Sequence, residues 1–415
     1  MREKRWLSGF VLAGILLAAG TGRSEVVGSL YNPADYTTGP GFNTHLNLHS
    51  NDTLTVYTGT SEANPWYSLD GGTNKYYGQK VSNQNNKVQL AVFCFDRVTI
   101  NGATIDITGG NLGLVLGSRS GFMFSNSTID VSGSAGASGA NAGGAGGPGA
   151  EGGTSMAAGF GTYASNPPDN RRGYGGLTTY WHGTPEQPKH GYGYGGGEWR
   201  NDDDDGAGGG YGGLGGELPG LSGYRGHSYG DALLKNLYGG SGGARAMQTG
   251  GRYGSGGGGG GSVSLIALGN LVISGSILAN GKTGGRHSSN GTKGGSGSGG
   301  GVLVAAQQVT LQSGASISAV GGDSSDGSGC GGGGRVVVHT GVFMPTWPND
   351  QADWSGSNAR TMTVEQLNEL AGLTVDGAVN PVNVSRGTGG SLGAHGTFYV
   401  LDYYVPPGGT LLMLQ

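Results

Sequence analysis

The chain has 415 residues, of which 95 are glycine, and only 12% of its residues are charged. Globular domains carry roughly 25% charged residues, so the surface of this protein relies on serine, threonine, asparagine and open backbone amides. The formal net charge is −4, and so small an excess argues against nucleic acid or anionic lipid as partners held by charge. A surface of this kind suits sugars, water, minerals or ice.

The first element, residues 1–24, has the three parts of a signal peptide. Basic residues occupy the start, an apolar run follows at Leu7–Ala19, and small residues at Ala18–Gly20 mark a cleavage site. The apolar run is shorter than the roughly 20 residues that a membrane-spanning helix needs. We therefore expect cleavage of the signal, a secreted, extracellular or cell-surface protein, and no stable transmembrane anchor in the mature chain.

Residues 25–87 are expected to form an N-terminal β cap. Short alternating stretches such as Thr53–Tyr57 are separated here by glycine, proline and asparagine turns. An irregular terminal structure is typical where a stack of strands would otherwise expose unpaired backbone groups at its open end.

A short β unit recurs along the chain, with alternating apolar and polar residues and a closing glycine. In its first copy Ile105 and Ile107 flank Asp106, and this period of two predicts a half-buried strand. The copies are Leu90–Gly109, Leu114–Gly133, Val263–Gly281, Val302–Gly321 and the truncated Arg335–Thr340.

The spacing of these units predicts how they stack. The first two begin 24 residues apart and the next two 39 residues apart. Periods of roughly 20–50 residues are typical of stacked repeats, because one unit cannot bury its apolar face alone. The expected fold is all-β: a right-handed parallel β-helix, or β-solenoid, with coils at residues 88–133 and 262–340. A β-sandwich is the alternative, since short alternating strands with turn signals also fit it.

Residues 134–261 form a glycine- and tyrosine-rich insertion between the two sets of coils. Glycine recurs at every third position in two runs near its start. For Ser134–Trp199 two interpretations stay open: packed glycine helices with three residues per turn, or a loose loop. The ten tyrosines of the insertion either pack against the coils, which is favoured, or stand exposed as stacking platforms for sugar rings. The candidates for sugar stacking are Trp181, Tyr192, Tyr194 and Trp199.

Residues 341–415 are expected to form a C-terminal cap, with one short helix at Thr363–Leu370 and a strand-like segment at Gly396–Tyr404.

The two cysteines lie far apart in sequence, and an exported chain meets an oxidising setting in which a disulfide can form. Cys94 alternates with Phe93 and Phe95, which favours a buried thiol, whereas Cys330 lies in a flexible glycine run. A disulfide between Cys94 and Cys330 would tie the first coil to the last, and it requires those coils to be neighbours.

Four consecutive carboxylates form the densest charge cluster of the chain. Oxygen ligands at this density could hold Ca²⁺, which is the only cofactor that the sequence raises. Consecutive side chains in an extended segment point in alternate directions, however, so a solvated acidic loop is the favoured interpretation. The residues are Asp202, Asp203, Asp204 and Asp205.

A second carboxylate pair, Asp106 and Asp130, occupies the same position of the β unit. In a β-helix the two would stack about 4.8 Å apart. Polysaccharide lyases with β-helix folds use carboxylates to hold Ca²⁺ and a basic residue to abstract a proton, a role open to Arg97 or Arg119. The later units lack the carboxylate, so a structural pair is favoured.

Strand motifs and glycine motifs occur together between Lys87 and Thr340. They include Thr-Ile-Asp-Val-Ser-Gly at Thr128–Gly133, then Gly146–Gly149, Ser228–Asp231, Gly239–Gly243, Gly256–Leu268 and Gly331–Val338. In this combination the chain resembles uncharacterised glycine-rich β-repeat proteins exported by environmental Gram-negative bacteria. The resemblance implies a surface or matrix protein and supplies no catalytic residues.

Two functions fit these features. The first is an exported structural or adhesive protein of the cell surface or extracellular matrix, without evident catalysis. The second is a polysaccharide-binding or polysaccharide-cleaving β-helix protein, a lyase or epimerase, which would need acidic and basic residues on one face. Glycine runs match parts of catalytic motifs by chance and lack the strand-to-helix context that such motifs require. The expected partner is extracellular polysaccharide or cell-surface matrix.

Overall fold

Every element in the described part of the computed structural model is a β-strand. The all-β class expected from the sequence is therefore confirmed there. The described residues are 45–59, 63–82, 89–108, 112–136, 191, 193, 195–198, 205–218, 220, 223–230, 232–234, 236–248, 252–286, 292–324, 327–341, 373–376 and 381–403.

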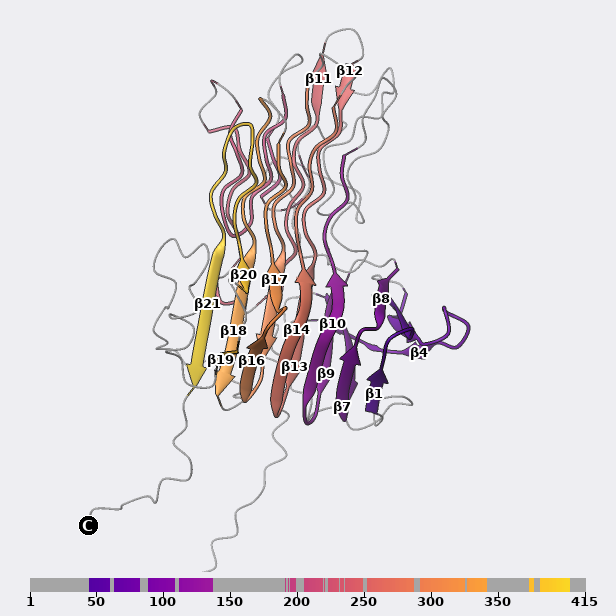
Figure 1. Ribbon diagram of the computed structural model, residues 1–415. Coiled ribbons are helices and arrows are strands. Elements are labelled where there is room, and N and C mark those ends of the chain that lie inside the picture. The colour runs from indigo at the N-terminus through magenta and orange to yellow at the C-terminus, as the bar shows by residue number, and fades with distance from the viewer. Residues whose placement is uncertain are drawn as a thin grey trace, which may run out of the picture.

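Two large sheets with parallel strands dominate the structure, and Figure 1 shows the strands of the first crossing the molecule one after another. The first, sheet A, has the order β1 (His45–Leu48), β7 (Arg97–Asn101), β10 (Phe122–Asp130), β14 (Asn270–Leu278), β16 (Gln308–Gln312) and β19 (Leu373–Asp376), with β17 (Ser316–Ser318) beside β14 and β20 (Val382–Asn383) beside β17.

The second, sheet C, has the order β21 (Thr397–Tyr403), β18 (Arg335–Gly341), β15 (Gly301–Ala305), β13 (Ser262–Ala267), β9 (Gly113–Ser118), β6 (Gln89–Phe95) and β5 (Gln79–Ser82), with β5 antiparallel.

Smaller elements complete the set. Sheet B has the order β4 (Tyr76–Tyr77), β3 (Trp66–Ser68), β2 (Thr53–Tyr57) and β8 (Thr104–Ile107), and β11 (Ala246–Gln248) forms a hairpin with β12 (Arg252–Gly254).

The chain runs repeatedly from a strand of sheet C to the next strand of sheet A, and we call each such pair of strands a layer. Strand β6 is followed by β7, β9 by β10, β13 by β14, β15 by β16 and β18 by β19, and each pair lies beside the pair before it. Phe122, for example, is the register partner of Val98 in one layer and of Leu271 in the next. Parallel pairing between layers departs from the antiparallel sheets of an ordinary β-sandwich.

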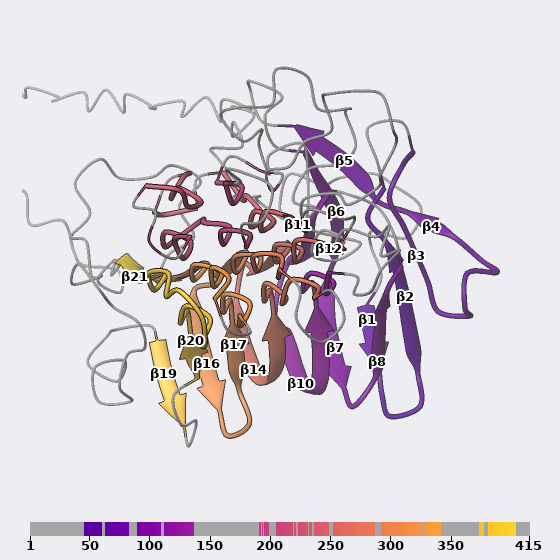
Figure 2. The same cartoon turned by 90° about the horizontal axis from the view of Figure 1, so that it is seen from above.

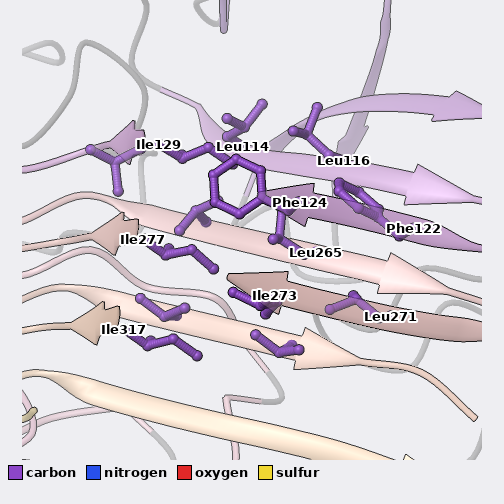
Figure 3. Packing of buried hydrophobic residues seen from close by; sticks show 14 of the residues in the cluster. Leu114, Leu116, Phe122, Phe124, Ile129, Leu265, Leu271, Ile273, Ile277 and Ile317 are labelled. Atoms are coloured by element: carbon purple, nitrogen blue, oxygen red, sulfur yellow. The ribbon is translucent and has the colours of Figure 1, made fainter. Parts of the chain in front are cut away.

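The main core fills the space between sheets A and C. Alternation along β10 and β14 turns every second residue inward, and Phe124, Ile129 and Ile277 are completely buried there. Leucines from sheet C meet them from the other side (Figure 3). The alternation with a period of two in the sequence thus determines which side chains of sheet A point into the core.

Sheet C is covered on its outer face as well. Tyr211, Leu234, Leu237 and Tyr238 of the insertion join the outward residues of sheet C in a second buried cluster. Strands β9, β13 and β15 are accordingly buried along their whole length. The favoured interpretation, in which insertion tyrosines pack, holds for these described residues.

Glycine segments continue from the strands as a separate body, which we call the glycine bundle. Gly257 donates its N–H to the Gly295 carbonyl (2.9 Å), and Gly260, three residues later, donates to Ser298 (2.8 Å). This step of three is the period of an extended three-residue-per-turn helix that bonds only to its neighbours. Figure 2 shows the segments as narrow coils side by side. They are 131–136, 205–216, 239–245, 254–261, 279–286, 292–301, 319–324, 327–334 and 384–396.

Close packing explains why these segments are glycine. A Cβ atom on Gly297 would lie 2.1 Å from the carbonyl oxygen of Gly258, and one on Gly260 would lie 2.1 Å from that of Ala279. Both distances are far inside van der Waals contact, so the neighbouring backbones leave room only for hydrogen. Of the run Ser134–Trp199, only residues 134–136 and a few near its end are described, and Gly133 and Gly136 follow the same step of three.

Candidate functional site

The outward side of sheet A carries exposed and half-buried side chains from four strands, and we call it the polar face. The same alternation that buries Phe124 and Ile273 turns the residues between them to solvent. It comprises Arg97, Thr99, Asn101, Met123, Ser125, Asn126, Thr128, Asp130, Asn270, Val272, Ser274, Ser276, Leu278, Gln308, Thr310 and Gln312.

Parallel register aligns these side chains in ladders across the sheet. One ladder runs through Asn101, Ser125 and Ser274, and another joins Ser276 to Thr128 on one side and to Ser316 on the other. Neighbouring strands in a sheet lie about 4.8 Å apart. The polar face therefore presents hydroxyl and amide groups in regular rows.

Hydrogen bonds fix part of these rows. Ser125 Oγ and Asn126 Nδ2 both donate to Asn101 Oδ1, each at 3.0 Å. Asn126 adopts a left-handed backbone (φ 50°) at a register shift in β10. Groups held by their neighbours in the free protein lose little conformational freedom when a ligand binds.

The polar face is almost uncharged. Arg97 and Asp130 are the charged residues among those named, and they stand at opposite ends of sheet A. Val98, next to Arg97, pairs with Phe122, which precedes Asp130 by about eight residues, or roughly 25 Å of strand. Binding to this surface therefore depends on uncharged groups, which are mostly hydroxyls and amides and include the apolar Met123, Val272 and Leu278.

The predicted stacking of Asp106 on Asp130 does not occur in sheet register. Asp106 lies in β8 opposite Thr55, whereas Asp130 ends β10 opposite Leu278. The cause is local, because the chain turns at Gly102 (φ 74°) after β7, and β8 then pairs with β2 in sheet B.

Arg97 and Arg119, the candidate bases for this carboxylate pair, do not lie together with both carboxylates. Arg97 begins β7 opposite His45, and Arg119 Nη1 lies 3.3 Å from Asp96 Oδ1. Neither arginine shares a row with both carboxylates, so these four residues do not build one acid–base site.

The predicted calcium ligands lie partly outside the described residues, which include Asp205 but not Asp202, Asp203 or Asp204. Asp205 Oδ1 accepts the backbone N–H of Lys293 (2.7 Å), which ties two glycine segments together. Within the described ranges, no group of three or more histidine, cysteine, aspartate and glutamate residues is arranged to hold a metal ion.

The cysteines are buried as thiols in different places, so the structure contains no Cys94–Cys330 disulfide. Cys94 faces the second cluster, and Cys330 Sγ donates to the carbonyl of Thr388 (3.1 Å) in the glycine bundle. Burial raises the pKa of Cys94 to about 12 and also raises that of Cys330. Both sulfurs therefore stay protonated and unreactive in the folded chain.

No family model, curated protein or solved structure matches this chain. Its candidate site therefore has to be judged from its own residues.

The residues predicted for sugar stacking, Trp181, Tyr192, Tyr194 and Trp199, all lie outside the described part of the chain. The polar face was not among the sites predicted from the sequence. Its signal was present in the polar positions of the alternating strands, but choosing the exposed sheet required knowing which sheet the insertion covers.

Within the described residues there is no helix long and apolar enough to cross a membrane.

Proposed function

We propose that this chain is an exported structural protein of the cell surface or extracellular matrix that adheres through its polar face. The observation that carries the proposal is the contrast between the two sheets: sheet C is buried on both sides, whereas sheet A offers rows of hydroxyl and amide groups to solvent. A broad surface of this kind suits a solid or polymeric partner better than a small molecule, for which proteins use concave pockets.

The proposed architecture is a right-handed β-solenoid whose coils are the successive layers of sheets C and A, closed by segments of the glycine bundle. Supporting it, the chain alternates between the sheets, and equivalent residues such as Ile129, Ile277 and Ile317 are register partners. The signal peptide predicted at residues 1–24, which lies outside the described residues, is the basis for proposing export, and N-terminal sequencing of secreted protein tests that part directly.

Polysaccharide binding is a second candidate, favoured by the uncharged rows of Ser125, Ser274, Thr128 and Ser276. Hydroxyl and amide side chains both donate and accept hydrogen bonds, as sugar hydroxyls do. Cleavage is not part of the proposal, because Asp106, Asp130 and the two arginines are not gathered in one place.

Binding of the mature chain to insoluble cellulose, chitin and isolated cell-surface matrix tests the adhesive function. Ser274→Arg places a long charged side chain in the middle of the polar face, and we expect it to weaken the apparent affinity at least about tenfold, or about 1.4 kcal/mol. Leu392→Arg adds the same charge at a residue that is 53% exposed and lies off sheet A, and should bind like the wild type.

Wild-type adhesion should also persist between about 0.05 and 0.5 M salt, because exposed charges, which salt screens, contribute little to it. Equal binding by Ser274→Arg and the wild type would remove the polar face from the proposed function.

A further inference from the structure

Sheet B carries a row of aromatic side chains on one face. Tyr57 of β2 is the register partner of Trp66 of β3, which is in turn the partner of Tyr77 of β4. Directly opposed residues of antiparallel strands point to the same side, with Cβ atoms about 5 Å apart. The three rings, which we call the aromatic row, thus form a strip about 10 Å wide.

The aromatic row is accessible. Tyr77 is 57% exposed, while Tyr57 and Trp66 are partly exposed and stack with ring centroids 5.7 Å apart and an interplanar angle of 27°. Aromatic pairs across strands stabilise a sheet, and a contiguous group of exposed apolar rings is also typical of a binding surface.

The row rests on a fixed base. On the other face of sheet B, the buried Tyr67 packs edge-on against Phe93 and Phe95 of sheet C, with centroids 5.9 and 5.5 Å away. Tyr76 stacks on Tyr67 at 5.1 Å. The β3–β4 hairpin is therefore anchored to the core while its outer side stays open.

The ammonium group of Lys75 lies beside the aromatic row. Lys75 Nζ lies 4.5 Å from the centroid of the Trp66 ring, and the exposed Lys75 has no ion-pair partner among the described residues. The nearby Asp70 is bound within the hairpin turn, where its Oδ1 accepts from Ser68 Oγ (2.6 Å) and from the Asn74 N–H (2.9 Å).

These hydrogen bonds hold the pKa of the Asp70 carboxyl below its ordinary value, and the bond from the Ser68 hydroxyl has the largest effect. The Asp70 carboxylate is thus directed into the turn, and the Lys75 ammonium remains available to a ligand.

We propose that the aromatic row binds an acidic polysaccharide that contains uronic acid units. The C–H face of a sugar ring packs on the exposed Tyr77 ring, as on aromatic platforms generally, and the Lys75 ammonium, which lies over the neighbouring Trp66 ring, pairs with the carboxylate of a uronate. A neutral sugar would contact the rings and form no ion pair with Lys75, whereas a small anion would pair with Lys75 and make no contact with the rings. The site lies on sheet B and goes beyond adhesion through the polar face.

The test measures binding of the mature chain to sodium polygalacturonate and to its fully methyl-esterified form by affinity electrophoresis. We expect the esterified polymer to bind about tenfold more weakly, because it keeps the sugar rings and loses the charge. Tyr77→Ala and Trp66→Ala should each weaken binding of polygalacturonate about tenfold or more, and Trp66→Phe, which keeps a ring, should retain most of it.

Lys75→Gln should reduce the preference for polygalacturonate over its ester to near one, and should remove the weakening by salt between about 0.05 and 0.5 M. Lys282→Gln, which removes one cation on another part of the molecule, and Leu392→Ala serve as matched controls that bind normally.

The proposal is overturned if polygalacturonate does not bind, if the ester binds equally well, or if Tyr77→Ala, at the exposed edge of sheet B, binds like the wild type. Ser274→Arg on the polar face should leave this salt-sensitive binding intact. The two sites can therefore fail independently.

Discussion

At the scale of single residues, strand β18 contains a histidine in an apolar setting. His339 is 6% exposed, and burial lowers its pKa from 6.5 to about 3 because the charged imidazolium loses its hydration there. The folded chain therefore holds this side chain neutral at any pH above about 3, while the unfolded chain protonates it below about 6.5.

This difference predicts loss of stability in acid. Between pH 6.5 and 3 the unfolded state binds one proton at this residue that the folded state does not, so the free energy of unfolding falls as pH decreases, by at most about 1.4 kcal/mol per pH unit. The non-titrating His339→Gln should show a smaller loss than the wild type between pH 7 and 4.5 in urea denaturation. His49→Gln, at an exposed histidine, is the control, and an unchanged slope in His339→Gln would contradict the prediction.

At the scale of elements, the glycine segments are joined mainly by bonds between backbones. Gly297 donates its N–H to the Lys282 carbonyl (2.9 Å) and Gly300 donates to Ala279 (2.7 Å), each in a neighbouring segment. Glycine loses more backbone entropy on folding than any other residue, and this loss opposes folding of the segments. Dense hydrogen bonding between close backbones offsets that loss, and it tolerates no side chain at the contact.

Gly297→Ala should consequently destabilise the protein by roughly 1–3 kcal/mol, the range for inserting an atom into a packed interior. The new Cβ would start 2.1 Å from the Gly258 carbonyl oxygen. Gly121→Ala is the matched control, since its nearest atom is the Asn270 carbonyl oxygen at 3.7 Å. Urea midpoints measure both, and equal midpoints would mean that the bundle is looser than described.

At the scale of the whole molecule, the insertion segment and sheet C are joined by one buried cation. Arg335, 6% exposed, donates from Nη2 to the carbonyls of Tyr229 (2.9 Å) and Tyr211 (3.4 Å) and from Nη1 to Thr397 Oγ1 (3.1 Å). Its guanidinium also lies 5.4 Å from the Tyr211 ring centroid. One side chain of β18 thus holds the covering segment and the last strand of sheet C.

Arg335→Met should loosen that cover. Hydrogen bonds from a charged donor contribute roughly 1.5–3 kcal/mol each, and about 1.4 kcal/mol of local destabilisation raises the open population about tenfold. Chymotrypsin should cut at Tyr229 or Tyr238 about tenfold faster in native buffer. Arg225→Met removes a surface ion pair with Glu217 (2.9 Å), which contributes little, and equal cleavage of the two variants would contradict the role of Arg335.

Much of the strand content was readable from the sequence, because alternation is a local property. The strands around Ile105, Ile129, Ile277 and Ile317 were expected and are present. The first two predicted units begin at Leu90 and Leu114, whereas the register partner of Leu114 is Ala91. Such one-residue differences arise because the turn between two strands, and not the repeat alone, fixes register.

The candidate sites were harder to predict. The aromatic row joins residues from three strands of five, three and two residues that carry no repeat, so no linear pattern marked it. The carboxylates Asp106 and Asp130 did share a linear pattern, yet the turn at Gly102 sends their strands to different sheets.

The sequence by itself determined that the described chain is all-β, which residues face inward along the alternating strands of sheet A, and that glycine recurs with a period of three. All of these follow from steric and solvation preferences over a few neighbouring residues. Only the tertiary structure decided which sheet faces solvent, because that depends on where the insertion packs. It also decided which side chains of sheet B meet, because pairing between strands brings together residues that no local preference links.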